Sequence, residues 1–373
     1  MKAGFDAKRA FLNDSGLGNY SRTTLNALKE YYPDNDYVLF TPQISDELFP
    51  NYKDFDIISP DSSFSRIFKS LWRSFSLSGQ LKKHSIDLFH GLSNELPEGI
   101  HKTDVPSLVT IHDLIFMRHP DFYRTVDRNI YYRKVKYACE AATRIIAISN
   151  QTREDIIRYF KVNPDRIETL HQAIGPVYFD KQNTSGLYTK YELPEKFMIC
   201  VGTIEHRKNQ LTLLKALKNE KIDTPVVFVG EPTMYATELL KFISENNMDS
   251  KVKFLSKIPE EELAGLYQIA ELSVYISLFE GFGLPIIEAM ACGCPVLTSN
   301  LSCLPETAGG AALLCNPADE NAIGKKLRGL LENSETRSKL TAKGKERAKQ
   351  FHPEIYSKKL ISLYSGIIEP EYA

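Results

Sequence analysis

Short apolar runs alternate along the chain with longer segments in which apolar residues recur every three to four positions. The runs form two sets: 2–7, 37–41, 87–91, 107–112 and 144–149, then 196–202, 225–230, 251–256, 272–278 and 295–299. Such runs predict buried strands, and the longer periodic segments predict helices between them. Alternating strands and helices form a parallel sheet that is covered on both faces. We therefore predict an α/β chain with two doubly wound, Rossmann-like domains.

A polar segment rich in turn residues separates the two sets. We place this linker near residues 180–194, which predicts a first domain over 1–180 and a second over 190–351. The C-terminal stretch 352–373 has the pattern of an amphipathic helix. We expect it to pack back on the first domain, although the pattern alone does not place it.

Composition narrows the classes of function. A chain of 373 residues with a net charge of −1 has no bulk electrostatic attraction for nucleic acid. No apolar run reaches membrane-spanning length, and Asp6 comes too early for a signal peptide, so we expect a cytoplasmic protein. The six cysteines lack C-x-x-C spacing, which favours reduced, buried thiols over a zinc site.

Each half of the chain has two glycines just before a helix, where the backbone can approach a ligand closely. In the first half these residues form a polar loop after the first strand: Gly16, Leu17 and Gly18. In the second half they follow the strand at 272–278: Gly281, Phe282 and Gly283. Because parallel sheets bind ligands at the carboxyl ends of their strands, both loops are candidate ligand contacts.

Two carboxylates flank the second glycine loop. Glu280 follows the strand, and Glu288 lies near the start of a helix that we predict over 286–292. Leu284 occupies the position of a capping side chain but cannot cap, so the free N–H groups there could bind an anionic or hydroxyl-rich ligand. Alternatively, Glu280 caps these groups and Glu288 only complements the helix dipole.

Adjacent cations follow another strand of the second set. The strand ends at Gly202 and Thr203, and the next loop carries Arg207 and Lys208 just before Asn209, a predicted helix cap. Two cations beside a helix N-terminus can neutralise a diphosphate. The alternative is a pair of solvated surface charges.

His112 and Asp113 stand at the end of a predicted buried strand of the first domain. A histidine there could hydrogen-bond a ligand hydroxyl or take part in proton transfer. A histidine that only satisfies structural hydrogen bonds is equally compatible with the sequence.

Taken together, these motifs resemble family-4 retaining glycosyltransferases of GT-B fold, in particular the mannosyltransferase-like branch. The donor half of that family resembles "GTIEHRKN", "EGFGLPIIEAMACGCPV" and "SNLSCLPETAGGAALLCNP", with its signature E-x7-E spacing. The acceptor half resembles "SGLGNYSR", "TIHDLIFMRHPDFY" and "RIIAISNQTREDI". The resemblance covers nearly the whole chain in the right order. It implies two Rossmann-like domains that face a central cleft.

The resemblance also implies roles for the candidate residues. Lys208 and Arg207 would hold the donor diphosphate, and Glu288 would bind the ribose of the nucleotide. Glu280 and the N–H groups of the loop that follows it would hold the donor sugar and a nearby phosphate. His112 would touch a sugar hydroxyl, and Gly16 and Gly18 would let the first loop close. Thr203 departs from the pattern, because many members carry arginine there.

The implied reaction is transfer of a hexose with same-face attack, in which the leaving phosphate takes the acceptor's proton. The best candidate is mannose from GDP-mannose, moved to a saccharide or lipid-linked saccharide in cell-surface polysaccharide synthesis. UDP-glucose or UDP-GlcNAc as donor, a nucleotide-sugar epimerase and a silent nucleotide-sugar-binding subunit are the alternatives. The Asp-x-Asp triplets at 34–36 and 54–56 lie in polar stretches. We interpret them as surface charges and expect no metal and no cofactor.

One further segment has two interpretations. Residues 64–83 contain no acid, and their apolar side chains, including the single tryptophan Trp72, follow helical spacing opposite Arg66, Lys69 and Arg73. A basic amphipathic helix of this kind can lie on an anionic membrane. Packing of the apolar stripe on the first domain is the more common use and our preferred interpretation.

Overall fold

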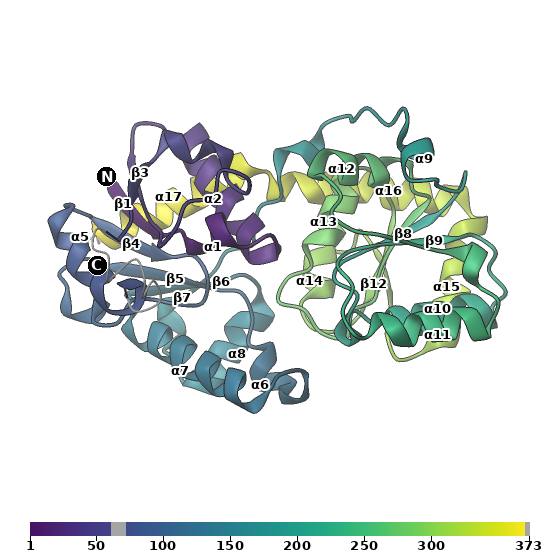
Figure 1. Ribbon diagram of the computed structural model, residues 1–373, viewed down its shortest axis with the longest axis horizontal. Coiled ribbons are helices and arrows are strands. Elements are labelled where there is room, and N and C mark those ends of the chain that lie inside the picture. Colours follow the sequence, from purple (N-terminus) through teal and green to yellow (C-terminus); the bar gives the residue numbers. More distant parts are fainter. Residues whose placement is uncertain (61–71, 370–373) are drawn as a thin grey trace. The chain divides into compact units, whose positions relative to one another are not determined.

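The computed structural model describes residues 1–60 and 72–369 and divides into two compact units (Figure 1). The first unit contains Met1–Ala173 and the C-terminal segment from Pro353, and the second contains Ile174–His352. Each unit has one parallel sheet with helices on both faces.

The sheet of the first unit has the strand order β3-β2-β1-β4-β5-β6-β7. Its strands are β1 (Lys2–Asp6), β2 (Asp36–Phe40), β3 (Asp56–Ile58), β4 (Leu88–Gly91), β5 (Ser107–Ile111), β6 (Arg144–Ala147) and β7 (Ile167–Thr169). The order reverses between β1 and β4, and this reversal defines a doubly wound sheet.

Two hydrophobic clusters cover the faces of this sheet. Phe5, Leu39 and Leu88 belong to the cluster that also takes in α2 and α17, whereas Phe40, Phe89 and Val109 face the cluster with α5, α7 and α8. The helices of the unit are α1 (Lys8–Leu12), α2 (Gly16–Tyr31), α5 (Leu77–Lys83), α6 (Ile115–Arg118), α7 (Thr125–Ala141), α8 (Asn150–Phe160) and α17 (Pro353–Ile368).

The sheet of the second unit has the order β10-β9-β8-β11-β12-β13, with its reversal between β8 and β11. Its strands are β8 (Met198–Val201), β9 (Val226–Val229), β10 (Val252–Leu255), β11 (Leu272–Tyr275), β12 (Val296–Ser299) and β13 (Leu313–Cys315). The helices are α9 (Leu187–Lys190), α10 (Gln210–Asn219), α11 (Ala236–Glu245), α12 (Glu260–Ile269), α13 (Leu284–Ala291), α14 (Leu304–Ala308), α15 (Glu320–Glu332) and α16 (Ser334–Ala348). Helices α10, α11 and α15 share one hydrophobic cluster with the strands.

All ten predicted strands are present, and the parallel α/β class is confirmed. The sequence prediction missed three further strands, β3, β7 and β13. Each has only three residues and lies at the edge of its sheet. A three-residue strand is too short to produce a recognisable alternation of apolar and polar positions.

The predicted domain boundary lies too late in the chain. The second unit begins at Ile174, not near 190, and its N–H donates to the carbonyl of Phe351 at 3.2 Å. The 3-10 helix Pro176–Phe179 packs on α12 and α13, and α9 packs on α12. The segment was predicted to be a linker because it is rich in turn residues, and this composition gives no sign of the apolar contacts that attach it to the second unit.

The C-terminal helix α17 packs on the first unit, as expected. Its buried Tyr356 hydroxyl lies 2.9 Å from the hydroxyl of Tyr20, and its Tyr364 hydroxyl lies 2.7 Å from Nδ1 of His90. The other ring nitrogen of His90 lies 2.8 Å from the hydroxyl of Thr110. Burial lowers the pKa of His90 to about 3, so the ring is neutral at physiological pH.

The described part of the basic amphipathic segment packs into the first unit. Trp72 is 5% exposed and lies in the same hydrophobic cluster as Leu77 and Leu81. Arg73, which we placed on the polar face, is buried and pairs with Asp6 and Glu95, both at 2.6 Å. For Trp72, Leu77 and Leu81 the packing interpretation is therefore correct, while residues 64–71 lie outside the described residues. Within the described ranges, the structure contains no helix that is both long and apolar enough to span a bilayer.

Replacing Trp72 by alanine should lower the free energy of unfolding of the first unit by about 3–5 kcal/mol, because a large buried side chain would leave a cavity. Urea unfolding followed by circular dichroism measures this change. Met234→Ala is the control, since Met234 is 93% exposed. An unchanged unfolding midpoint for Trp72→Ala would contradict the packing described here.

Candidate active site

The reversal of strand order in the second unit brings two loops together. Strands β8 and β11 are neighbours, so the loops that follow them start side by side at the carboxyl edge of the sheet. The N–H of Leu278 donates to the carbonyl of Arg207 at 2.9 Å, and the Asn209 amide donates to the carbonyl of Ile276 at 3.2 Å. These bonds join the cationic loop to the loop that carries Glu280.

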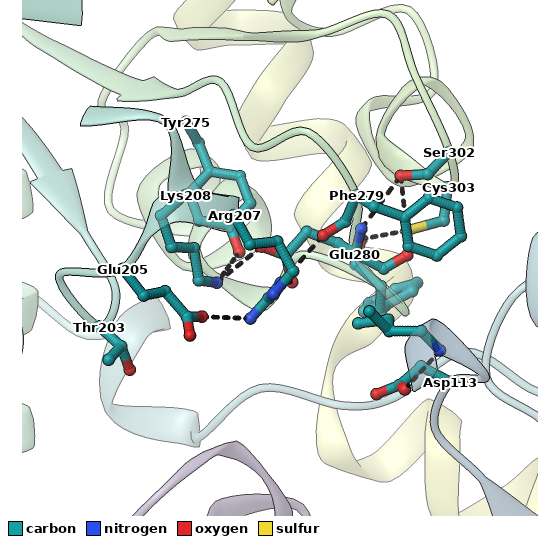
Figure 2. Close-up of polar contacts among 12 residues, drawn as sticks. Asp113, Thr203, Glu205, Arg207, Lys208, Tyr275, Phe279, Glu280, Ser302 and Cys303 are labelled. Carbon is teal, nitrogen blue, oxygen red and sulfur yellow. Dashed lines mark hydrogen bonds and ion pairs between the residues drawn. The ribbon is translucent and has the colours of Figure 1, made fainter. Parts of the chain in front are cut away.

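Arg207 and Lys208 converge on Glu280 (Figure 2). Arg207 lies 2.5 Å from one carboxylate oxygen of Glu280, and the Lys208 ammonium lies 2.7 Å from the other. Arg207 also pairs with Glu205 at 2.6 Å and donates to the carbonyl of Phe279 at 2.9 Å. The two cations are therefore not solvated surface charges.

Glu280 is 7% exposed and is ionised at physiological pH. Burial would raise its pKa, but the charges of Lys208 and Arg207 outweigh burial and lower the pKa to about 2. The suggestion that Glu280 caps the next helix is wrong, because no side chain caps α13 and the cap residue is Gly283.

Helix α13 begins at Leu284, two residues earlier than predicted, and Pro285 lies in its first turn. Gly283 has φ 99°, and a Cβ there would lie 2.7 Å from Cδ2 of Leu304. Glycine is therefore required at the cap for both its backbone conformation and its close packing. The result is a helix start without a side-chain cap, next to the two cations.

Three side chains that the sequence did not single out hold the loop before α13. The Glu280 N–H donates to the Ser302 hydroxyl at 3.3 Å, and the Thr307 hydroxyl donates to the carbonyl of Phe282 at 2.6 Å. The Cys303 thiol lies 3.2 Å from the same carbonyl. These polar contacts come from the segment after β12 and fix the backbone of residues 280–283.

Glu288 occupies the next turns of α13 and is separate from the ion cluster. Its Oε2 accepts a hydrogen bond from the hydroxyl of Tyr267, which is 3.3 Å away on α12. Burial of the carboxyl group, helped by the negative charge of Glu260, raises the pKa of Glu288 to about 8. The pKa values of the two glutamates of the E-x7-E motif are thus shifted in opposite directions, lowered in Glu280 and raised in Glu288.

Gly202 gives space to the Lys208 side chain. Its φ is 138°, and a Cβ there would lie 3.3 Å from Cε of Lys208. Thr203 is exposed, and its carbonyl accepts from the Gln210 amide at 3.0 Å. Asn209 is the predicted cap of α10, but its side chain bonds to loop carbonyls and does not cap the helix.

In the first unit, both ring nitrogens of His112 have protein partners. Nε2 lies 2.8 Å from the carbonyl of Leu92, and Nδ1 lies 2.8 Å from the amide nitrogen of Gln172. Burial lowers the pKa of His112 to about 4 despite its bond to Leu92. This arrangement favours the structural alternative over proton transfer, and a contact with a sugar hydroxyl stays a prediction. Asp113 accepts from the N–H of Ile115 at 3.0 Å.

The loop predicted at residues 16–18 is helical. Gly16, Leu17 and Gly18 form the first turn of α2. A Cβ on Gly18 would lie 1.8 Å from the carbonyl oxygen of Asn13, so this glycine is needed for close packing of α2 on the segment after α1. The predicted role in closing on a ligand has no support from this geometry.

The described residues contain no group of three or more His, Cys, Asp or Glu side chains that could hold a metal ion. Asp36 and Asp56, from the two Asp-x-Asp triplets, are the first residues of β2 and β3. They therefore lie at the amino ends of their strands, opposite to the edge where such sheets bind ligands.

Comparisons with known proteins agree with this geometry. Residues 189–347 match the family described as "Glycosyl transferases group 1", and residues 15–176 match "Glycosyltransferase Family 4". The O-antigen chain mannosyltransferase B of Escherichia coli is 32% identical over 292 residues, which are 76% of this chain and 75% of that protein. The chain belongs to the family-4 retaining glycosyltransferases of GT-B fold.

Further similar proteins cover most of the chain. The O-antigen chain mannosyltransferase RfbU of Salmonella typhimurium is 27% identical over 322 residues, 83% of this chain and 85% of that protein. The crystal structure of Anabaena HepE in complex with UDP has a TM-score of 0.76 at 16% identity and covers 98% of this glycosyltransferase and 100% of HepE. This last likeness supports the fold.

Glu288→Gln should stabilise the glycosyltransferase against heat increasingly as pH rises. The pKa of Glu288 is raised from 4.5 to about 8, so the folded protein keeps a proton that the unfolded chain releases. The wild type therefore loses stability as pH rises between about 4.5 and about 8, whereas glutamine does not titrate. Calorimetric melting at a series of pH values measures the difference, with exposed Glu261→Gln as control. A difference that does not change with pH would contradict the raised pKa.

Proposed function

We propose that this glycosyltransferase transfers mannose from GDP-mannose to a saccharide or lipid-linked saccharide in the synthesis of a cell-surface polysaccharide. The observation that carries the proposal is the pair of cations, Arg207 and Lys208, held beside the uncapped start of α13. Two cations and a helix N-terminus are suited to a diphosphate. The mannose assignment is supported by the names of the O-antigen mannosyltransferases that the chain resembles.

In the proposed reaction, the bond between the sugar C1 and the diphosphate oxygen breaks. Arg207 and Lys208 stabilise the negative charge that develops on the leaving diphosphate. The acceptor hydroxyl oxygen forms the new bond to C1 on the same face, and its proton passes to a phosphate oxygen. No side chain has to act as a nucleophile, and no metal ion takes part.

The proposed parts of the two glutamates follow from their environments. Glu288 hydrogen-bonds the ribose hydroxyls, and its carboxyl group can do so whether or not it is ionised. Glu280 is already ionised and pairs with both cations, so a bound diphosphate has to share Arg207 and Lys208 with it. With its remaining hydrogen-bonding capacity Glu280 holds the donor sugar.

A thermal-shift panel of nucleotide sugars tests the donor. GDP-mannose should raise the melting temperature by mass action, and UDP-glucose and UDP-GlcNAc should not. Preferential stabilisation by a UDP-sugar would replace the proposed donor.

In a transfer assay, activity should persist in excess EDTA. Turnover of the donor in the absence of an acceptor would favour an epimerase.

Glu288→Ala should weaken GDP-mannose binding about 10- to 100-fold, because the ribose would lose its hydrogen bonds to the carboxyl group. Isothermal titration calorimetry measures this loss. Asp36→Ala is the control, since Asp36 lies at the exposed amino end of β2 and should leave the affinity unchanged. Equal affinities for the wild type and Glu288→Ala would place the nucleotide elsewhere.

A further inference from the structure

The ammonium group of Lys208 is held by a second residue besides Glu280. Its Nζ donates to the hydroxyl of Tyr275 at 2.7 Å and lies 4.9 Å from the centre of the tyrosine ring (Figure 2). Lys208 thus has two polar partners, Tyr275 and Glu280.

Tyr275 is placed rigidly enough to orient another side chain. It is the last residue of β11, is 3% exposed, and pairs with Thr298 of β12. Its carbonyl accepts from the Thr298 hydroxyl at 2.6 Å. A side chain on a buried, paired strand keeps its position better than one on a loop.

These two contacts determine which N–H donor Lys208 can offer to a ligand. An ammonium group has three N–H donors. Among the described residues, Tyr275 and Glu280 take two of them, at 2.7 Å each. Because two donors are directed, the direction of the third is set as well, and it is available to one oxygen of an anion.

We propose that Tyr275 is a positioning residue that directs the Lys208 ammonium toward the diphosphate of the donor. This inference rests on the proposed function, because it assigns the anion to a nucleotide sugar. Without the Tyr275 hydroxyl, the long lysine side chain has more freedom and one N–H without an acceptor. Binding of the diphosphate then costs more conformational entropy, because Tyr275 no longer holds the lysine side chain in one position beforehand.

The chain provides a matched control for removal of a tyrosine hydroxyl. Lys190, Tyr191 and Glu262 form the same combination of residue types on the surface of the second unit. The Lys190 ammonium lies 2.7 Å from Glu262 and 5.1 Å from the centre of the Tyr191 ring. The Tyr191 hydroxyl donates to Glu262. Tyr191→Phe therefore removes an equivalent group away from the cationic loop.

A double-mutant cycle tests the proposal by calorimetric titration of GDP-mannose into the wild type, Tyr275→Phe, Lys208→Met and the double variant. Tyr275→Phe should weaken binding about five- to tenfold, a typical loss for one hydrogen bond. In the Lys208→Met background, the same change should have no further effect, because Tyr275 acts through Lys208. Tyr191→Phe should bind like the wild type.

Two results would overturn the proposal: wild-type affinity in Tyr275→Phe, or equal losses from Tyr275→Phe with and without Lys208. The second result would show a structural role, which a lowered melting temperature would accompany. The wild-type titration by itself tests the donor. If the wild type binds another nucleotide sugar, the cycle is measured with that ligand and still decides the role of Tyr275. If the wild type binds no nucleotide sugar, the proposed function and this inference both fall.

Discussion

The second unit depends on one arrangement of charges: Arg207 and Lys208 are largely buried against the carboxylate of Glu280, and Arg207 also pairs with Glu205. Buried charges are tolerated only with partners, and removal of one partner from a buried pair typically costs about 3–5 kcal/mol. Glu280 therefore stabilises the fold of the second unit even without a ligand. It holds together the loops after β8 and β11, whose neighbouring starts follow from the reversal of strand order. A site for an anion is thus built from a charge cluster that the protein already balances internally.

In the first unit, buried polar and charged side chains are likewise paired with other protein groups. His90 and His112 are buried, neutral, and bonded through both ring nitrogens to protein groups. Arg73 is buried against two carboxylates. Because these groups satisfy one another, they attach α17 and the segment after residue 71 to the sheet. In Glu288, by contrast, burial is not matched by a cation at bonding distance, so its pKa is raised instead of lowered.

The sequence predicted more of the fold than of the site. All ten predicted runs became strands, because the period and burial of such runs are local properties. The edge strands β3, β7 and β13 are too short to show a period. In the site, the structure brings Arg207, Lys208 and Glu280 together, and their roles toward a ligand stay predictions. Tyr275, Ser302 and Thr307 were missed, since their roles depend on contacts with residues 22 to 67 positions away in the chain.

The sequence by itself determined the α/β class, the two sheets and the identity of the charged residues, because strand and helix periods and motif spacing are properties of neighbouring positions. Only the tertiary structure decided which unit residues 174–190 join, that Trp72 and Arg73 are buried, and that the first glycine loop is helical. It also decided that Glu280 is ionised while Glu288 holds its proton. The pKa of a carboxyl group depends on the distance to other charges and on burial, and spacing along the chain encodes neither.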